Sequence, residues 1–251
     1  MRLEPTAVVQ IVTGEVGTWS KLSGIPFPVA KTQWGTMTSE NEKTDDRKTE
    51  QLHLSSQFTR AVDYARHIHI ERRKGTDIPY MAHLLGVASL VMGEAGHAGF
   101  PVSEEMVIAV LLHDAVEDQG GLPRLKDIEQ NFGPNVARMV EGLSDSVSED
   151  SSMKKPWSER KHAYIQRLRD EPADVQLISA ADKLYNARAI LEDYREIGLK
   201  VWGRFKRGRD EQLRYLDELL AVYKSTGMGR IVGELERVVN ELRQISAEET
   251  H

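Results

Sequence analysis

The pattern of apolar and polar residues is irregular up to about residue 55 and periodic after it. Before that point, glycines and prolines fall at irregular intervals, and residues 39–50 are almost wholly polar and charged. A segment with so little periodic apolar surface has little with which to offset the entropy lost on ordering. We therefore expect residues 1–55 to form a weakly ordered N-terminal extension, with one short strand around residues 8–12.

From Phe58 onward the apolar residues follow the period of an α-helix. The pattern predicts a first helix that ends at the basic run of residues 72–75, and a second helix opened by Pro79 and Tyr80. Ser103 precedes two glutamates, which is typical of a helix N-cap. The helix that it begins is apolar nearly all round over residues 106–112, which indicates a central position in the fold.

The rest of the chain continues the helical pattern. Further helices are expected at residues 123–132, 134–143, 158–169, 172–193, 204–224 and 229–246. A polar stretch at 144–156 is expected to be a mobile loop, and strand signals are almost absent. Residues 56–250 therefore predict a single all-α helical bundle. Trp202 and Phe205 are expected in helix packing, and His67, His69 and His162 on solvated helix faces.

Composition limits the classes of function. Of the 251 residues 29% are charged, the formal net charge is −6, and there is no cysteine. The negative balance argues against broad nucleic-acid binding, and the missing cysteines exclude disulfides and thiolate metal sites. No apolar run is long enough to span a membrane, and the N-terminus lacks the pattern of a secretion signal. These features predict a cytoplasmic protein.

The most informative segment is residues 111–118, where an apolar helix pattern turns abruptly polar. It contributes His113, Asp114, Glu117 and Asp118, whose spacings spread the four groups over one broad face of a helix. Each unpaired charge taken from water costs several kcal/mol, so the cluster needs a compensating partner. A divalent metal ion is the partner that this composition favours.

Two further segments supply metal ligands from elsewhere in the chain. Asp182 stands inside another apolar helix pattern, and His83 lies shortly after the start of the second predicted helix. The candidate ligand set is therefore His83, His113, Asp114 and Asp182. Two imidazoles and two carboxylates leave coordination positions open for water and substrate, and without cysteine they favour Mn, Fe, Zn or Mg.

Five blocks in order resemble the hydrolase domain of the RelA/SpoT family, a group of HD metallohydrolases, over about residues 57–195. The blocks are Arg73-Lys74, Pro79-Tyr80-Met81-Ala82-His83, His113-Asp114-Ala115-Val116-Glu117-Asp118, Phe132-Gly133-Pro134-Asn135-Val136 and Asp182-Lys183-Leu184-Tyr185-Asn186-Ala187-Arg188. The dipeptide His-Asp alone is a weak signal, whereas five blocks at plausible spacing are a strong one.

The resemblance implies a role for each matching residue. The ligands of one manganese ion, or of another divalent metal, would be His83, His113, Asp114 and Asp182. The pair that orients and deprotonates the attacking water would be Glu117 and Asp118. The contacts to the nucleotide would come from Arg73 and Lys74 at the base and Asn186 at the ribose, with Arg188 supporting the site electrostatically. Ala189 departs from family members that have threonine there, so one hydroxyl contact is missing.

Simpler interpretations stand beside these roles. His113 and Asp114 could form a buried hydrogen-bonded pair without metal, and Glu117 and Asp118 could form a solvated helix end. The second is disfavoured because negative charge at a helix C-terminus opposes the helix dipole. For the basic run of residues 72–74, stabilisation of a helix end is as good an explanation as base binding.

The resemblance implies a stand-alone phosphohydrolase that removes the 3′-pyrophosphate of guanosine tetra- or pentaphosphate, giving GDP or GTP. One alternative is a phosphatase of another nucleotide, such as NADPH or a nucleoside monophosphate. A second is a non-catalytic nucleotide sensor, which Glu117 and Asp118 argue against, since a pure binder needs no water-activating pair. The expected partner is a phosphorylated nucleotide, without nucleic acid or membrane, and a homo-oligomer stays open.

Overall fold

The computed structural model describes residues 51–145 and 155–248. The strand expected at residues 8–12 and most of the loop expected at 144–156 lie outside the described residues. The helices are α1 (Ser56–Ile68), α2 (Tyr80–Gly93), α3 (Glu104–Leu112), α4 (Ala115–Asp118), α5 (Gly121–Phe132), α6 (Pro134–Leu143), α7 (Trp157–Leu168), α8 (Ala173–Ile197), α9 (Gly208–Lys224) and α10 (Gly229–Glu248), with a 3₁₀ helix η2 (Gly198–Arg204). The described part of the chain contains no strand, so the all-α prediction is confirmed.

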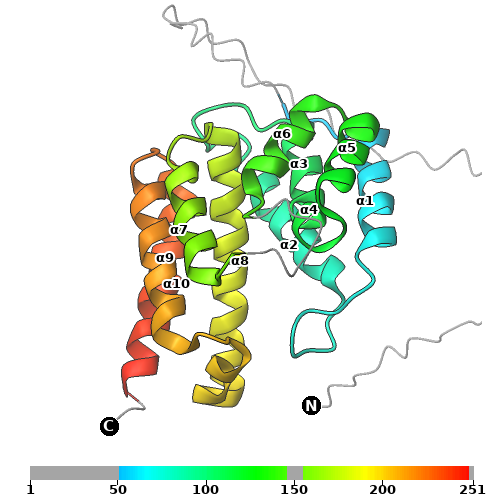
Figure 1. The fold of residues 1–251 in the computed structure, drawn as a ribbon. Coiled ribbons are helices and arrows are strands. Elements are labelled where there is room, and N and C mark those ends of the chain that lie inside the picture. Colours follow the sequence, from blue (N-terminus) through cyan, green and yellow to red (C-terminus); the bar gives the residue numbers. More distant parts are fainter. Residues whose placement is uncertain (1–50, 146–154, 249–251) are drawn as a thin grey trace, which may run out of the picture. The chain divides into compact units, whose positions relative to one another are not determined.

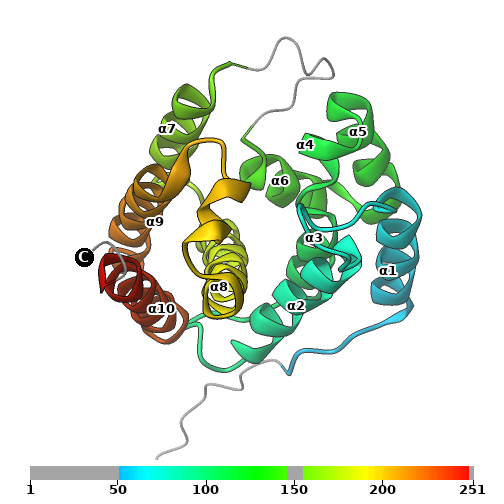
Figure 2. The same cartoon turned by 90° about the horizontal axis from the view of Figure 1, so that it is seen from below.

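Helix α8 lies between two groups of helices (Figures 1 and 2). It packs on α2, α3 and α6 on one side, and on α9, α10 and η2 on the other. Its sequence explains this position, because buried residues fall all round its first half rather than on one stripe. A polar side chain on α8 can therefore face the first group of helices while the helix is anchored by the second.

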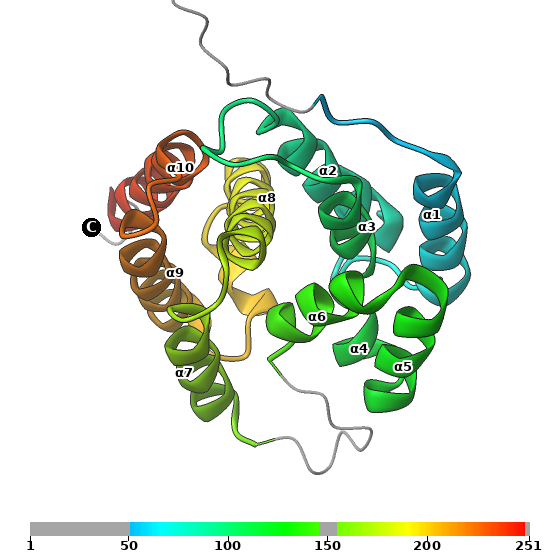
Figure 3. The ribbon, with the colours of Figure 1, turned by 90° about the horizontal axis from the view of Figure 1, so that it is seen from above.

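Helix α3 lies against α1, α2 and α6 (Figure 3). All seven residues from Met106 to Leu112 are buried, as the apolar pattern predicted. At its amino end the Ser103 side chain accepts a hydrogen bond from the Met106 backbone N–H at 3.3 Å, which confirms the predicted N-cap. The helix ends at the cavity described below, where His113 is buried, Asp114 and Glu117 are partly buried and Asp118 is exposed.

The Glu104 carboxylate at the start of α3 also fixes the start of α1. It accepts hydrogen bonds from the Ser55 backbone N–H at 2.5 Å, from the Ser55 hydroxyl at 3.0 Å and from the Phe58 N–H at 3.3 Å. The Ser55 hydroxyl in turn caps Gln57. Because these groups satisfy donors that a helix start leaves open, α1 has a defined beginning within the described residues.

We expect a protein that begins at Gln51 to fold, bind metal and hydrolyse substrate much as the full chain does. The reason is that Leu52 packs on the core and Ser55 completes the cap of α1, so residues from 51 onward contain the contacts described above. Melting temperature, oligomer size and turnover of the two proteins provide the comparison. A truncated protein that is insoluble, or inactive with metal present, would show that the first 50 residues belong to the fold.

Two predicted helix boundaries are wrong in ways that affect the site. Helix α1 ends at Ile68, and the basic run does not end a helix: it lies in a loop, residues 69–79. In this loop the Arg73 N–H donates to the Ile78 carbonyl at 2.8 Å and the Tyr80 N–H to the Glu71 carbonyl at 3.0 Å. Gly75 turns the loop with a φ of +75°, a conformation that glycine adopts without strain.

The second wrong boundary is at His113. The sequence predicted one helix through residues 111–118, but α3 ends at Leu112 and a separate turn of helix, α4, begins at Ala115. The His113 ring Nδ1 donates to the Val110 carbonyl at 2.7 Å, an acceptor that the His113 backbone N–H approaches only at 3.5 Å. His113 and Asp114 therefore lie at a turn, where their side chains do not follow helical spacing.

The remaining boundaries moved by a few residues. Helix α8 continues to Ile197, η2 was not expected, and the helix predicted from residue 204 begins at Gly208. Trp202 is buried and Phe205 partly so, in line with the packing role predicted for them.

Tight packing of α2 against α8 leads to a prediction at Gly86. A Cβ atom added there would lie 2.0 Å from Cε2 of Tyr185, far inside contact distance. Overpacking of this kind ordinarily costs about 1–3 kcal/mol. We expect Gly86→Ala to lower the melting temperature, although alanine is the better helix former. Gly233→Ala on α10 is the matched control, because nothing lies within 4 Å of its added Cβ, and it should stabilise slightly. Equal effects of the two variants would contradict the packing argument.

Candidate metal centre and active site

The carboxyl end of α3, the loop before α2 and one face of α8 meet at a cavity of about 270 Å³. Its polar lining residues come from segments far apart in the sequence: they are Arg73, Lys74, Tyr80, His83, His113, Asp114, Glu117, Asp118, Asp145, Lys161, Tyr164, Ser179, Asp182, Lys183, Asn186 and Tyr215. All residues predicted for the site except Arg188 line this one cavity.

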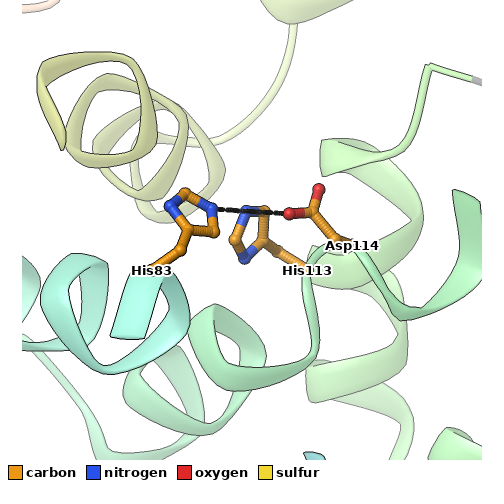
Figure 4. Close-up of side chains that lie close together, drawn as sticks. All are labelled: His83, His113 and Asp114. Carbon is orange, nitrogen blue, oxygen red and sulfur yellow. Dashed lines mark hydrogen bonds and ion pairs between the residues drawn. The ribbon is translucent and has the colours of Figure 1, made fainter. Parts of the chain in front are cut away.

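The two predicted histidine ligands lie next to one another in the wall of the cavity (Figure 4). Nε2 of His83, from α2, lies 3.4 Å from Nε2 of His113. Oδ2 of Asp114 lies 3.5 Å from the first of these nitrogens and 3.0 Å from the second. These three side chains form a group whose ligand atoms are close enough to share one metal ion.

Asp182 reaches the same two nitrogens from α8. Its Oδ1 lies 3.3 Å from Nε2 of His83 and 3.6 Å from Nε2 of His113. Both imidazoles and Asp182 are almost fully buried. Ligand atoms about 2.0–2.2 Å from one ion lie roughly 3–3.5 Å from their neighbours, which is the spacing found here. The donor set therefore fits a divalent cation.

The tautomer of His113 supports the same conclusion. Its Nδ1 lies 2.7 Å from the Val110 carbonyl oxygen, which can only accept a hydrogen bond, so Nδ1 carries the proton. In the neutral ring the lone pair is then on Nε2, the atom that faces His83 and the two carboxylates. A backbone acceptor that fixes the tautomer in this way is typical of metal-binding histidines.

Asp182 is held from two sides. Asn186, one turn further along α8, donates to Oδ1 at 2.7 Å, and the Lys183 ammonium lies 2.5 Å from Oδ2. Burial raises the pKa of Asp182, but the positive charge of Lys183 and the hydrogen bonds of the two histidines outweigh burial and hold the pKa well below its usual value. Burial lowers the pKa of Lys183, but the negative charge of Asp182 has the larger effect and raises that pKa well above its usual value. Asp182 therefore stays ionised.

Asp114 is oriented by Tyr80. The phenol of Tyr80 donates to Oδ2 of Asp114, the same oxygen that faces the histidines. Burial raises the pKa of Asp114, while the charge and hydrogen bond of His113 hold it well below its usual value. Burial raises the pKa of the Tyr80 phenol, and the negative charge of Asp114 raises it further. The hydroxyl therefore keeps its proton and remains a donor.

Glu117 faces the cavity from α4 and lies near a second carboxylate that the sequence did not single out. Arg160, on α7, bridges the two: its Nη1 lies 3.4 Å from Oε1 of Glu117 and also contacts Asp145. Lys161 lies 2.7 Å from Oδ2 of Asp145. Burial raises the pKa of Glu117, and the negative charge of Asp145 raises it further. A raised pKa suits a group that exchanges protons near neutral pH.

The loop of residues 69–79 brings Arg73 and Lys74 to the cavity. The Arg73 guanidinium donates to Oδ1 of Asn186 at 2.8 Å and lies 5.4 Å from the centre of the Tyr185 ring. Asn186 thereby connects Arg73 to Asp182, because its amide nitrogen contacts the Asp182 carboxylate. Arg73 is anchored to α8, whereas Lys74 is exposed at the cavity edge.

Arg188 lies outside the cavity, and the expectation for His69 is wrong. Arg188 does not line the cavity, because α8 directs its guanidinium to Glu234 on α10, so its contact is between helices. His69 is not on a solvated face: it is 3% exposed, its Nδ1 lies 2.7 Å from Oε1 of Glu71, and its ring stacks on Tyr80 with 5.1 Å between centroids. The helix ends just before His69, which turns the side chain inward.

Several cavity residues carry no clear signal in the sequence. Asp145 stands in a polar stretch, where one more carboxylate gives no signal. Lys161 and Tyr215 follow ordinary amphipathic patterns on α7 and α9, and only packing shows that they reach the cavity. Lys183 lay within a recognised block, and its charge inside an apolar helix was a usable signal.

The chain is similar to proteins of known family. The family model described as "HD domain" matches residues 61–211. The guanosine-3′,5′-bis(diphosphate) 3′-pyrophosphohydrolase MESH1 of Mus musculus is 36% identical over 138 residues, covering 53% of this chain and 69% of the relative. The protein of the same name from Homo sapiens is 35% identical with the same coverage. The Aquifex aeolicus guanosine-3′,5′-bis(diphosphate) 3′-pyrophosphohydrolase is 30% identical over 54% of this chain and 18% of its own length.

A solved structure is similar over most of the described chain. It is described as "A metazoan ortholog of SpoT hydrolyzes ppGpp and plays a role in starvation responses". Its TM-score is 0.59 at 27% sequence identity, and the match covers 75% of this chain and 97% of that one. Among the described residues, no helix is both long and apolar enough to cross a membrane.

Proposed function

Because the chain belongs to the HD-domain family, we propose that it is a metal-dependent phosphohydrolase that removes the 3′-diphosphate of guanosine 3′,5′-bis(diphosphate), giving GDP and pyrophosphate, and GTP from the pentaphosphate. The observation that carries the proposal is the convergence of two imidazoles and two carboxylates on a cavity that also holds the Glu117 carboxyl. The relatives named above bear the same activity in their names.

The metal ligands in this proposal are His83, His113, Asp114 and Asp182, and the resident ion is Mn²⁺. A divalent ion at such a site lowers the pKa of a bound water towards about 7 and offsets charge on phosphoryl oxygens. The carboxylates of the cavity require such a cation, because without it they would repel a substrate that carries several negative charges. Imidazole donors suit Zn, Fe, Cu or Ni and carboxylate donors suit Mn or Mg, so the mixed set can hold manganese, and the RelA/SpoT resemblance is the reason to choose it.

Glu117 acts as the general base in this proposal, and Asp118 orients the attacking water. Glu117 has the appropriate environment, because burial and the neighbouring Asp145 raise its pKa. After bond cleavage the same carboxyl can return its proton to the leaving group. Arg73, Lys74 and Asn186 bind the nucleotide, with Asn186 also holding Asp182 in place.

The test is a screen of the purified protein with Mn²⁺ against phosphorylated nucleotides. The panel contains guanosine 3′,5′-bis(diphosphate), NADPH and nucleoside monophosphates. We expect the first to be hydrolysed with the highest kcat/KM and to release pyrophosphate. Faster release of phosphate from NADPH or from a monophosphate would favour a phosphatase of another nucleotide. Binding of a nucleotide without any turnover would favour a sensor.

The raised pKa of Glu117 gives a pH prediction. The base is active only when ionised, so kcat/KM should fall as the pH falls through the pKa of Glu117. Asp145→Asn removes a negative charge and frees Arg160 and Lys161 to act on Glu117, and both changes lower that pKa. We therefore expect the acid limb of the pH profile to move to lower pH. Asp217→Asn, in a surface pair with Arg243, is the control and should leave the profile in place.

A further inference from the structure

His69 is a buried titratable residue that the proposed mechanism does not use. Its side chain is completely buried and does not line the cavity. Its Nδ1 lies 2.7 Å from Oε1 of Glu71, and its Nε2 has no hydrogen-bond partner among the described residues. A buried nitrogen without a partner costs free energy that an apolar side chain at the same place would avoid. Packing alone therefore does not account for an imidazole at this position.

The Glu71 carboxylate fixes the orientation of the His69 ring. An ionised carboxylate only accepts hydrogen bonds, so Nδ1 of His69 is the donor. Burial raises the pKa of Glu71, but the hydrogen bond from His69 leads the contacts that outweigh burial and hold this pKa below its usual value. Glu71 also accepts a hydrogen bond from the Gln119 side chain and, at its backbone carbonyl, from the Tyr80 N–H at 3.0 Å. The ring is thereby anchored both to the loop of residues 69–79 and to the residue that follows α4.

The side chain of Tyr80 connects His69 to two of the proposed metal ligands. Its ring stacks on the His69 ring with 5.1 Å between centroids and 17° between planes. The same ring meets the His83 ring edge-on, with 5.3 Å between centroids. Its phenol oxygen donates to Oδ2 of Asp114. Tyr80 therefore contacts His83 and Asp114 together, and the ring of His69 supports it.

His83 depends on aromatic packing more than His113 does. Metal-binding histidines ordinarily donate their second ring N–H to an acceptor, which fixes the ring. His113 does so at the Val110 carbonyl, whereas Nδ1 of His83 has no such partner in the described part of the chain. The His83 ring is instead in edge-on contact with the rings of Tyr80 and Tyr185, at 5.3 and 5.1 Å between centroids. Displacement of Tyr80 would therefore loosen the position of His83.

We propose that His69 is a positioning residue of the metal centre and acts through Tyr80. Its ring, oriented by Glu71, keeps the Tyr80 side chain in place. Tyr80 in turn holds the two proposed ligands His83 and Asp114. This role rests on the proposed function through the choice of metal ligands. Without the ring of His69, Tyr80 is free to move, and the two ligands lose part of the alignment that one ion needs.

The test is the Mn²⁺ affinity of the full-length protein, measured from the electron paramagnetic resonance signal of free Mn²⁺. His69→Asn keeps a donor for Glu71 but removes the ring, whereas His69→Phe keeps a ring and removes the donor. Loss of an outer-shell partner ordinarily lowers metal affinity or activity by about 10–100-fold. We expect His69→Asn to weaken Mn²⁺ binding by about tenfold, and His69→Phe to bind the ion nearly as tightly as the wild type does.

Two further variants show whether the effect passes through Tyr80. His67→Asn makes the same change on the exposed face of α1 and should bind Mn²⁺ as the wild type does. In a Tyr80→Leu background His69→Asn should have no further effect, because the side chain through which it acts is gone. Unchanged affinity in His69→Asn, equal losses in His69→Asn and His69→Phe, or full additivity with Tyr80→Leu would each overturn the role of the ring. If His69→Asn does not fold, His69→Leu replaces it, since leucine also removes the ring but leaves less empty space.

Binding of Mn²⁺ needs no substrate, so this measurement is independent of hydrolysis. A wild type that binds Mn²⁺ but does not hydrolyse the bis(diphosphate) would contradict the proposed reaction alone. A wild type that binds no Mn²⁺ would contradict the metal centre and the role of His69 with it. In the hydrolysis assay, His69→Asn should lower kcat and leave the KM for the nucleotide unchanged, because His69 does not line the cavity. A change confined to KM would contradict the positioning role.

Discussion

Replacing His113 with alanine, or removing divalent metal from the wild type with a chelator, is expected to abolish hydrolysis. His113 contributes a buried Nε2 that faces Asp114 and Asp182, and the Val110 carbonyl fixes a proton on its Nδ1. Loss of this ligand removes the cation that offsets the cavity carboxylates. The transition-state stabilisation supplied by a metal amounts to several kcal/mol, so we expect activity to fall by about 10³-fold or more.

Elemental analysis of the purified protein checks the first part of this prediction. We expect about one divalent ion per chain in the wild type and a strong reduction in His113→Ala. Added Mn²⁺ should restore the chelated wild type but not the variant. His67→Ala, on an exposed face of α1, is the control and should keep both metal and activity. Active protein without metal would overturn the proposed centre.

Glu117→Gln is expected to separate metal binding from chemistry. Glu117 is not a proposed ligand, and glutamine has nearly the same shape, so the variant should retain its ion. It cannot accept a proton, and loss of a general base ordinarily lowers the rate by about 10²–10⁴-fold. We therefore expect kcat to fall by about 10²-fold or more while metal content and melting temperature stay close to those of the wild type.

The control for this variant is Glu129→Gln, an exposed glutamate on α5. This variant also removes one carboxylate charge, and Glu129 does not line the cavity. If Glu117→Gln turns over substrate at nearly the normal rate, Glu117 is not the base. Loss of the metal together with activity would instead give Glu117 a role in holding the ion.

The sequence determined the class of fold, because helical periodicity and capping are local properties. Ser103 was recognisable as an N-cap, Pro134 as the start of a helix, and the apolar run before His113 as a central helix. The sequence also identified the proposed ligand residues, since a charged group inside an apolar helix pattern has few physical explanations. The RelA/SpoT resemblance then connected proposed metal ligands that lie as many as 99 positions apart, from His83 to Asp182.

Only the tertiary structure decided how these residues meet. The turn at His113 and Asp114 could not be read from spacing, because the hydrogen bond of the His113 ring to Val110 competes with continuation of the helix. The positions of Asp145 and Lys161 at the cavity, and of Arg188 away from it, depend on how α6, α7 and α10 pack. The small cavity lined by Lys74 and Trp157 arises where the loop of residues 69–79, residues 205–207, α7 and α9 come together. Such contacts join segments far apart in the chain, and no local pattern of apolar and polar residues encodes them.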